Sequence, residues 1–548
     1  MTPSHRESPA WQRSLAQALV EDLPRLIGEP ADARLEELLS ALAAALCQGE
    51  LWLDLEGEAP EGVSAAHWPE GHRRALTTSA LARDPDGPLA LVGHRLAWRR
   101  WQWRRQEVLA ALVERASGGG GEEPGDSEDL GGLDGEQRRA VRAALAQGLV
   151  LILGGPGTGK TSTVGQLLAA LRRRHPDARV HLAAPTGKAA ARLRAATGGR
   201  ETCTTLHRLL ESRGDGFGRN RHRPLALDLL VIDEVSMVDL ELMGAVLEAL
   251  PASCRLVLVG DPAQLPPIAP GSLLLALQDD SVTDALVRQC IHLRTTYRNA
   301  GAIARVADAL RSQLEGKASP AATALGGLRP LLLQLGEGEN LSWREVTGSH
   351  LPRALLERLT EHQRRLAELA ADCWPDGEGD WASLLAERDR LLVLSPLRRG
   401  RWGIDAIHRA LLPTARRSTA GEAAPWPCGT PLLCRRNLPA LGLANGDIGV
   451  LVERGGERGP RRLLFGQEAP LWLHPAQLAG ALEPALALTV HKAQGSEARE
   501  VILLLEEARA PDPRLLYTAL TRARETVLLF TASAGSQTES PAPQGISA

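Results

Sequence analysis

The chain has 548 residues and a formal net charge of −3, with 44% hydrophobic and 24% charged residues. This composition is that of a folded globular protein, and the length allows about three or four domains of ordinary size. The near-neutral charge excludes a wholly basic nucleic-acid coat protein, although it permits a local basic groove. We find no apolar run of the roughly 18 residues that a membrane span needs, so no membrane association is expected. Met1 to Trp11 lacks the apolar core of a secretory signal.

Cysteine usage indicates the redox compartment of the protein, and lysine usage indicates candidate functional positions. The seven cysteines are scattered without paired spacing, which is typical of a reduced cytoplasmic protein and does not match a zinc site. Only four of the 63 basic residues are lysines, so each lysine indicates a position where a compact ammonium is needed. The lysines are Lys160, Lys188, Lys317 and Lys492. Three of these, and the two tyrosines Tyr297 and Tyr517, fall in the motifs described below.

The first part of the chain is predicted to be a helical domain over residues 1–116, followed by a Gly-, Ser- and acid-rich flexible linker over 117–132. Within it, Arg95 to Arg105 alternates arginine with tryptophan. That pattern fits either nucleic-acid stacking or an amphipathic helix that buries its tryptophans, and we favour the helix.

From Leu133 onward, short apolar runs alternate with helical patterns, which is typical of parallel α/β sheets. The runs are Val150–Leu153, Val180–Ala183, Leu229–Ile232, Leu256–Val259, Leu391–Leu394, Val501–Leu505 and Val527–Phe530. We predict two α/β domains, over 133–289 and 290–531. The second includes a long helical stretch from Leu351 to Cys373 and a small β insertion at about 413–475, and a disordered tail follows over 532–548.

A phosphate-binding loop follows the first of these strands. Its residues are Gly154, Gly155, Pro156, Gly157, Thr158, Gly159, Lys160 and Thr161, which spell G-x-x-x-x-G-K-T between a predicted strand and a predicted helix. The glycines let backbone N–H groups point at phosphate oxygens, and the helix N-terminus adds its dipole. Lys160 is expected to reach the β- and γ-phosphates of ATP, and Thr161 to hold Mg²⁺. The alternative is a glycine-rich turn with a chance lysine.

Polar residues at the ends of other strands complete the predicted nucleotide site. Asp233 and Glu234 end an apolar strand, where Asp233 would bind Mg²⁺ and Glu234 would orient and deprotonate the attacking water. Gln264 ends the next strand and is placed to sense the γ-phosphate. Gln137 precedes the loop and would read the adenine edge, with a solvated surface glutamine as the alternative. Ligands bind at this edge of open α/β sheets.

A series of further motifs resembles superfamily 1 helicases and, among them, the RecD family. They are Ala184–Leu193, Thr204–Leu210, Asp233–Met237, Gly260–Leu265, Thr296–Arg298, Leu441–Gly449, Thr489–Glu497 and Tyr517–Ala523. The resemblance covers Leu133 to about Thr531 well and the N-terminal region weakly. It implies two RecA-like motor domains with ATP between them, and travel along single-stranded DNA from 5′ to 3′.

The resemblance also assigns residues. Arg298 and Arg522 match arginines that reach across the cleft to the γ-phosphate, where such a residue is worth about 10³–10⁵ in rate. The resemblance assigns to DNA binding the positions Thr186, Lys188, His207, Thr489, His491, Lys492, Gln494 and Ser496. For all of these except His207 and Thr489, a place near the ATP cleft is the alternative. The segment 211–224 is either a basic hairpin that guides the duplex or a disordered loop.

Partners are inferred from the same resemblance. Only about 130 residues precede the motor motifs, which favours a subunit of a complex over a long stand-alone helicase. The expected partners are RecB- and RecC-like subunits at duplex DNA ends, with the N-terminal domain as the docking domain. A second alternative is an ATP-binding subunit without motor activity. A nuclease is disfavoured, because the sole Glu-x-Lys, Glu315 to Lys317, has no convincing acidic partner.

Overall fold

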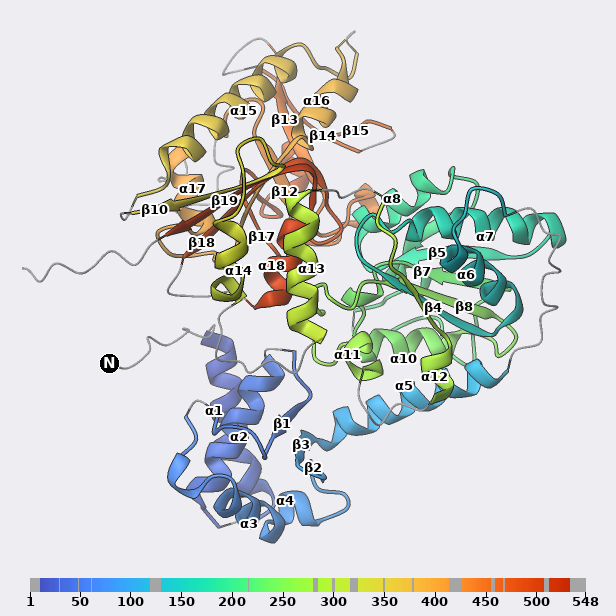
Figure 1. Ribbon diagram of the computed structural model, residues 1–548, viewed down its shortest axis with the longest axis vertical. Helices are drawn as coiled ribbons and strands as arrows, with labels where there is room; N and C mark the ends of the chain where they lie inside the picture. Colours follow the sequence, from blue (N-terminus) through green and yellow to red (C-terminus); the bar gives the residue numbers. More distant parts are fainter. Residues whose placement is uncertain are drawn as a thin grey trace, which may run out of the picture.

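The structure is a computed structural model that describes residues 10–28, 30–47, 49–60, 62–118, 130–214, 216–278, 284–297, 301–315, 324–347, 350–376, 379–412, 426–454, 459–466, 469–506 and 512–532. Within these ranges the strands form four sheets. Two are parallel and form the cores of two α/β lobes, while an antiparallel insertion and an N-terminal domain flank them (Figure 1).

The first lobe is built on a parallel sheet with strand order β6-β5-β7-β8-β4-β9. Its strands are β4 (Leu149–Gly154), β5 (Val180–Ala184), β6 (Thr202–Thr205), β7 (Leu229–Ile232), β8 (Arg255–Gly260) and β9 (Cys290–Leu293). Alternate residues of β4 enter two different cores: Leu151 packs with one and Ile152 with the other. The sheet is therefore buried on both faces, which is why its strands read as continuous apolar runs.

Helices cover both faces of this sheet. One face carries α6 (Gly135–Ala146), α7 (Lys160–Arg174) and α8 (Gly187–Ala196). The other face carries the 3₁₀ turn η2 (Val235–Met237), α9 (Leu206–Leu209), α10 (Leu240–Ala249), α11 (Leu273–Leu277) and α12 (Asp284–Arg288). Because β9 pairs with β4, the first lobe continues through Leu293, past the predicted boundary at residue 289.

The second lobe contains a parallel sheet with strand order β10-β19-β18-β11-β17. Its strands are β10 (Leu341–Val346), β11 (Leu391–Ser395), β17 (Leu488–Thr489), β18 (Ala498–Glu506) and β19 (Ala523–Ala532). One face packs against α13 (Ala302–Glu315), α14 (Ala324–Leu332) and α18 (Pro513–Leu520). The other face packs against α15 (Arg353–Ala371) and α17 (Ile404–Leu411).

The small β insertion is a five-stranded antiparallel sheet in the order β15-β14-β13-β12-β16. Its elements are β12 (Pro431–Cys434), η4 (Pro439–Leu441), β13 (Ile448–Glu453), β14 (Arg461–Phe465), β15 (Leu471–Leu473), η5 (Pro475–Leu478) and β16 (Leu482–Pro484). It packs on α15 and on α16 (Trp381–Arg388). The sheet extends to Pro484, beyond the predicted end at 475, and residues 413–425 lie outside the described ranges.

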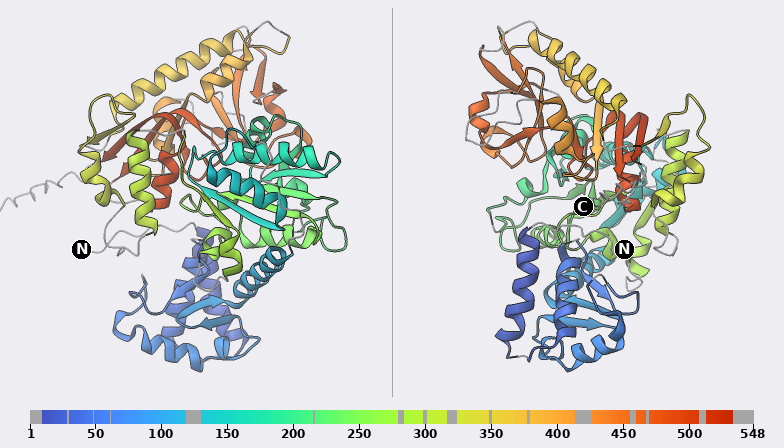
Figure 2. Two further views of the ribbon diagram at one scale, coloured as in Figure 1. Left: turned by 45° about the vertical axis from the view of Figure 1, so that its right-hand side comes forward. Right: turned by 90° about the vertical axis from the view of Figure 1, so that its left-hand side faces the viewer.

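The N-terminal domain combines helices with a three-stranded antiparallel sheet. It contains α1 (Ala10–Leu26), α2 (Ala33–Cys47), β1 (Trp52–Asp54), η1 (Ala65–His67), α3 (Glu70–Thr78), α4 (Ala80–Arg83), β2 (Leu89–Val92), β3 (Arg95–Trp98) and α5 (Arg99–Ser117). Figure 2 shows this domain below both lobes, with α5 leading from it to the first lobe. The sheet was not predicted, and the helix expected over Arg95 to Arg105 begins only at Arg99, because Arg95–Trp98 pairs with both neighbouring strands.

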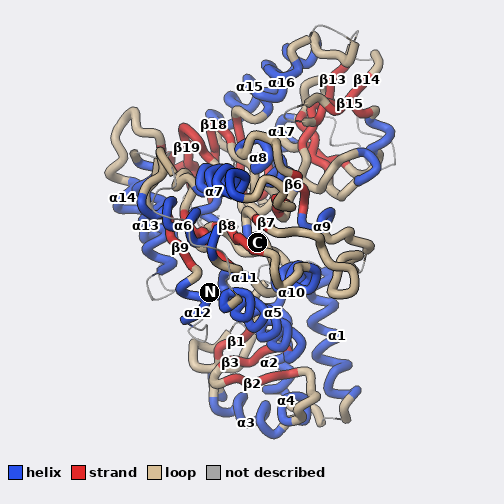
Figure 3. Tube along the Cα trace, turned by 90° about the vertical axis from the view of Figure 1, so that its right-hand side faces the viewer, coloured by secondary structure: helices blue, strands red, loops and turns tan. Residues whose placement is uncertain are grey.

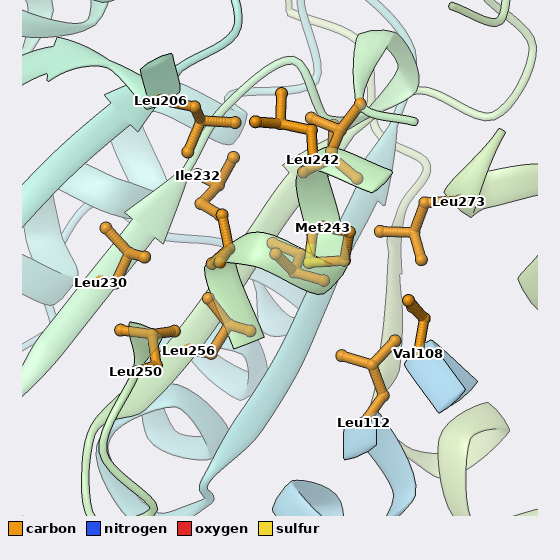
Figure 4. Packing of buried hydrophobic residues seen from close by; sticks show 14 of the residues in the cluster. Val108, Leu112, Leu206, Leu230, Ile232, Leu242, Met243, Leu250, Leu256 and Leu273 are labelled. Carbon is orange, nitrogen blue, oxygen red and sulfur yellow. The ribbon is translucent and has the colours of Figure 1, made fainter. Parts of the chain in front are cut away.

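Helix α5 ties the N-terminal domain to the first lobe through apolar packing. Val108 and Leu112 are 1% and 0% exposed and join the core beneath α10, where Met243 and Leu273 also lie (Figure 4). At the edge of this contact, Arg104 forms ion pairs of 3.2 Å with both Glu241 and Glu248. Helix α5 therefore belongs to the hydrophobic core of the first lobe, whereas most of the rest of the N-terminal domain packs around a core of its own.

The seven predicted apolar runs are all strands of the two parallel sheets, and the helix predicted over Leu351 to Cys373 is α15. In the described parts of the predicted basic segment, 211–214 and 216–224, antiparallel bridges join Ser212 to Phe217 and Asn220 to Arg223. Most of the predicted linker, 119–129, and nearly all of the predicted tail, 533–548, lie outside the described residues. In the described part of the chain, no helix is long and apolar enough to cross a membrane.

Candidate active site

The phosphate loop joins the end of β4 to the start of α7. Gly157 and Gly159 have φ angles of 76° and 81°, a left-handed backbone that glycine adopts without strain. Thr158 closes the loop by donating its hydroxyl to the carbonyl of Gly155 at 2.9 Å. The predicted loop conformation is thus present, with the N-terminus of α7 directly behind it.

Lys160 occupies the mouth of this loop. Its Nζ donates to the carbonyl oxygens of Gly154 and Gly155 at 2.7 and 2.8 Å. Burial lowers the pKa of Lys160, and the nearby carboxylates of Asp261, Glu234 and Asp233 oppose that shift. The ammonium is therefore held by neutral carbonyls, next to the loop where a phosphate would bind.

Gln137 and Tyr297 lie against the second half of the loop. Gln137 donates its Nε2 to the carbonyl of Thr158 at 3.3 Å, and its Oε1 accepts from the backbone N–H of Asp134 in a capping box. Tyr297 donates its N–H to the carbonyl of Gly157 at 2.8 Å and its hydroxyl to Asp134 at 2.6 Å. The ring of Tyr297, a residue that we did not predict for this site, is 60% exposed beside the loop.

An acidic pair follows β7. Asp233 and Glu234 are 5% and 7% exposed, and the carboxylate of Asp233 accepts the N–H of Glu234 at 2.9 Å. Burial, together with the charge of Glu234, raises the pKa of Asp233 to about 6. Glu234 has a φ of 54°, which is unusual for a residue other than glycine, so its side chain is aimed by a locally strained backbone.

The donors available here fit a magnesium ion. The described residues contain no cluster of three or more Asp, Glu, His or Cys with metal-binding geometry. Mg²⁺ does not need one, because it is commonly held by one or two protein oxygens together with phosphates and water. Burial and the neighbouring carboxylate of Glu234 raise the pKa of Asp233. A bound cation would stabilise the charged form of this carboxylate.

The loop after β8 meets the second lobe. Asp261 is 2% exposed and accepts a hydrogen bond of 2.8 Å from the hydroxyl of Tyr517 on α18. Gln264 is buried and directs its Nε2 to Asp261 at 3.4 Å. Leu265 donates its N–H to the hydroxyl of Thr518 at 2.8 Å. The predicted γ-phosphate sensor therefore sits where the two lobes touch.

The predicted arginines have different outcomes. Arg298 lies outside the described residues. Arg522 is 2% exposed, and it donates to the carbonyls of Thr518 and Ser496 at 3.2 and 3.4 Å, both in the second lobe. Arg311 on α13, an arginine that we did not predict, has its guanidinium against the phosphate loop. The sequence could not single out Arg311, because it is one of many arginines and lies on an ordinary helical pattern.

Two side chains of α8 bridge the lobes on the other side of the cleft. Arg192 pairs with Glu497 at 2.6 Å, and its guanidinium also lies 3.8 Å from the carboxylate of Glu234. Lys188 donates its Nζ to the hydroxyl of Ser496 at 3.0 Å. The loop that follows β17 thus touches both α8 and the vicinity of the acidic pair.

Comparison with known proteins adds a family to this geometry. Residues 137–270 match an AAA domain model, and residues 484–530 match the UvrD-like helicase C-terminal domain. The chain is 35% identical to the RecBCD enzyme subunit RecD of Mycolicibacterium smegmatis over 94% of its own length and 92% of that protein. The chain belongs to the RecD family.

Other relatives are more distant or only partly matched. The ATP-dependent RecD2 DNA helicase of Deinococcus radiodurans is 33% identical, over 72% of this chain but 48% of that protein. A Pif1 helicase structure, described as a basis for DNA unwinding at forked dsDNA by two coordinating Pif1 helicases, matches 72% of the chain and 91% of its own at 16% identity, with a TM-score of 0.40.

The residues of this RecD-family chain that were predicted to bind DNA do not form one cluster. Lys188 and His207 line a hollow of about 790 Å³ between α8 and the β insertion, together with Arg194, Arg208 and Arg388. The helices α8 and α9, which carry the first-lobe residues of this set, both lie next to β6 (Figure 3). Thr186 caps α8 next to the hollow, by accepting the N–H of Ala189. The hollow is lined by these five basic side chains, and also by the carboxylates of Glu211 and Asp447, and we take it as a candidate path for a DNA strand.

The remaining positions lie elsewhere. Lys492 is paired with Glu483 and lines a second hollow of about 540 Å³ on the second lobe, with Arg398 and His408. Thr489 accepts the N–H of Lys492, and burial lowers the pKa of His491. Gln494 is buried and donates to the carbonyl of Leu265, so its side chain faces the ATP side of the cleft and the loop that carries Gln264.

Proposed function

We propose that this chain is an ATP-driven DNA helicase that moves 5′ to 3′ along single-stranded DNA as a subunit of a RecBCD-type complex in the cytoplasm. The observation that carries the motor assignment is the contact of both lobes at one phosphate loop. Gly154 to Thr161 belong to the first lobe, and Arg311 and Tyr517 approach them from the second.

The proposed chemistry uses the residues already placed. Lys160 would leave the carbonyls of Gly154 and Gly155 for the β- and γ-phosphates of ATP. Asp233 and Thr161 would hold Mg²⁺, which neutralises phosphate charge when bound. Glu234 would take a proton from water as the water oxygen bonds to the γ-phosphorus and the bond to the ADP oxygen breaks.

Coupling to movement follows from where the lobes touch. Hydrolysis removes the γ-phosphate that both lobes would bind, so the contacts at Asp261, Tyr517 and Arg311 would loosen in each cycle. The contacts of α8 with Glu497 and Ser496 would then shift as well, next to the hollow that contains Lys188. Melting one base-pair step costs about 1–2 kcal/mol, which is within the reach of one ATP.

The DNA-binding surface that we propose is the hollow between α8 and the β insertion. Its lining combines Lys188, Arg194, Arg208 and Arg388 with the hydroxyls of Thr204 and Thr205. Cations and hydroxyls bind phosphates without reading bases, which suits sequence-independent tracking. The predicted positions Thr186 and Ser496 lie beside this surface, whereas Lys492 would belong to a separate contact on the second lobe.

The complex-borne role rests on full-length similarity. Relatives named RecBCD enzyme subunit RecD match the chain over more than nine-tenths of its length, including the N-terminal domain. We propose that this domain docks on RecB- and RecC-like subunits at duplex DNA ends. The stand-alone alternative is weaker, because the match to RecD2 covers 72% of this chain.

One pair of assays tests the motor. Lys160→Gln is expected to abolish DNA-stimulated ATP hydrolysis while leaving assembly with RecB- and RecC-like subunits intact, and Arg353→Gln, whose side chain is 92% exposed, is the matched control. Wild-type hydrolysis by the Lys160→Gln variant would refute the assigned site. Unwinding of a duplex with a 5′ single-stranded tail, but not a 3′ tail, is the expected polarity.

The non-motor alternative predicts a different result. A purely structural ATP-binding subunit would bind nucleotide and assemble, but the wild-type chain would show no DNA-stimulated hydrolysis and no tail-dependent unwinding. The buried acidic pair and the cross-lobe contacts at Asp261 favour the motor, because a passive subunit needs neither.

A further inference from the structure

Arg311 is held at the cleft by a short relay of hydrogen bonds. Its Nη2 donates to the hydroxyl of Tyr517 at 3.0 Å, and that hydroxyl donates to Asp261 at 2.8 Å. The guanidinium carbon also lies 5.7 Å from the centre of the Tyr517 ring. Tyr517 is fully buried, so it fixes the direction in which Arg311 points.

The guanidinium of Arg311 touches the phosphate loop itself. A Cβ atom placed on Gly155 would lie 2.3 Å from Arg311 Nη2 and 3.1 Å from the hydroxyl oxygen of Tyr517. A glycine at this position is therefore what permits the arginine to reach the loop. Lys160 Nζ is bound to the carbonyl of the same residue at 2.8 Å, so two cations converge on Gly155.

The positive charges of Arg311 and Lys160 next to Gly155 favour the binding of an anion there. The only carboxylate that pairs directly with Arg311 among the described residues is Asp308, at 3.3 Å on the same helix and mostly exposed. Such an exposed pair contributes little, because solvent screens it. Two cations brought together at a loop built to bind phosphate repel each other. The charge of Asp261, which acts on both, offsets part of this repulsion, and a phosphate bound between them would offset the rest.

The position along the loop selects which phosphate. Gln137 and Tyr297 contact Thr158 and Gly157, in the second half of the loop, whereas Arg311 contacts Gly155. Arg311 also shares its relay with Asp261, one of the carboxylates that surround Lys160. Arg311 therefore lies at the end of the loop near Lys160, Asp261 and the proposed γ-phosphate position. Tyr297 and Gln137 contact the other end of the loop.

We propose that Arg311 is a third arginine of the nucleotide site, which binds the γ-phosphate of ATP from the second lobe, with Tyr517 as its positioning residue. This assignment rests on the proposed ATPase function and adds a catalytic residue to it. Arg311 would donate to the non-bridging oxygens of the γ-phosphate and stabilise the charge that develops there as the bond to ADP breaks.

The test compares nucleotides that differ only in the γ-phosphate. In Arg311→Ala, the affinity for a non-hydrolysable ATP analogue with Mg²⁺ is expected to fall about tenfold or more, the loss of one charged hydrogen bond, while the affinity for ADP stays within about twofold. DNA-stimulated kcat is expected to fall about a hundredfold or more, the usual cost of removing one donor to transition-state charge. Arg305→Ala, on the same helix and paired with Glu339 on the surface, is the matched control and should match wild type.

Two further variants separate catalysis from structure. Arg311→Lys keeps the charge but not the fork, so it should restore part of the analogue affinity and little of kcat. Tyr517→Phe keeps the buried ring and removes the hydroxyl, so it should lower kcat with unchanged ADP binding. Equal losses for ADP and the ATP analogue, or no loss for either, would overturn the proposal. A wild-type chain that binds neither nucleotide would instead overturn the ATPase function itself.

Discussion

Arg192 of the first lobe and Glu497 of the second are joined by an ion pair of 2.6 Å, and the same Arg192 lies 3.8 Å from Glu234. Glu497 is 7% exposed in its side chain and also pairs with Arg524 at 3.0 Å. One guanidinium is thus shared between the proposed catalytic carboxylate and the loop that follows β17. Through this shared guanidinium, DNA bound beside α8 could influence ATP hydrolysis at Glu234.

Glu497→Gln is expected to weaken this influence of DNA on hydrolysis. The amide keeps the shape but loses the charge, so Arg192 would be drawn toward Glu234 whether or not DNA is bound. We expect the ratio of ATPase rates with and without single-stranded DNA to fall at least fivefold, the lower end of typical coupling between sites. Glu525→Gln, which breaks the surface pair with Arg499, is the control. An unchanged ratio in Glu497→Gln would show that this ion pair plays no part in coupling.

DNA binding is expected to depend on pH through Lys188. Burial lowers the pKa of its ammonium to about 8, from an ordinary value of 10.5. A lysine with a lowered pKa loses its charge as the pH rises through 8, so affinity for single-stranded DNA should fall between pH 7 and pH 9. The dependence of log affinity on log salt should become shallower by about one phosphate contact over the same interval.

Lys188→Arg is the control for this pH effect. An arginine remains charged throughout the interval, so the variant should keep its affinity from pH 7 to pH 9. In the wild type, the folding stability that depends on Lys188 should rise with pH, whereas the DNA affinity falls. The folded chain binds this proton less tightly than the unfolded chain, so stability from this group rises from pH 8 toward pH 10.5. If Lys188→Arg showed the wild-type pH profile of DNA affinity, another group would be responsible.

Gly155→Ala and Arg311→Ala are expected to be non-additive. The added methyl group would occupy the place of the Arg311 guanidinium and push it off the loop, so each single change should lower DNA-stimulated kcat. Once Arg311 is gone, the methyl group has less to displace, and the double variant should be about as active as Arg311→Ala alone. Steady-state ATPase rates of the four chains give the coupling. Fully additive losses would mean that the methyl group harms the loop independently of Arg311.

The parts of the fold that depend on local pattern were predicted from the sequence. Each of the seven apolar runs is a strand, because a buried parallel strand needs a continuous apolar segment whatever its partners are. The loop from Gly154 to Thr161 was found for the same reason, since its glycines are needed by its own backbone. The sheet of the N-terminal domain was missed, because β1 and β2 are too short to show a periodicity.

The contacts between lobes could not be predicted in this way. Arg311 is a routine residue on an amphipathic helix, and its role depends on where α13 packs relative to β4. Gln494 was placed near DNA or ATP by its motif alone, and only the packing of the lobes shows that it bonds to Leu265. Tyr297 and Tyr517 did carry a signal, since the chain has two tyrosines and both contact this site.

The attachment of the N-terminal domain can be tested through Leu112. This residue of α5 is 0% exposed and packs in the core of the first lobe, so Leu112→Ala would leave a cavity between the two units. We expect the free energy of unfolding of this part of the chain to fall by about 2–5 kcal/mol. Leu333→Ala, at a leucine that is 67% exposed, is the matched control and should change it by less than about 0.5 kcal/mol. Guanidinium unfolding followed by tryptophan fluorescence measures both. Equal stability of the two variants would mean that α5 is held by its polar contacts, led by Arg104, and that the apolar contact contributes little.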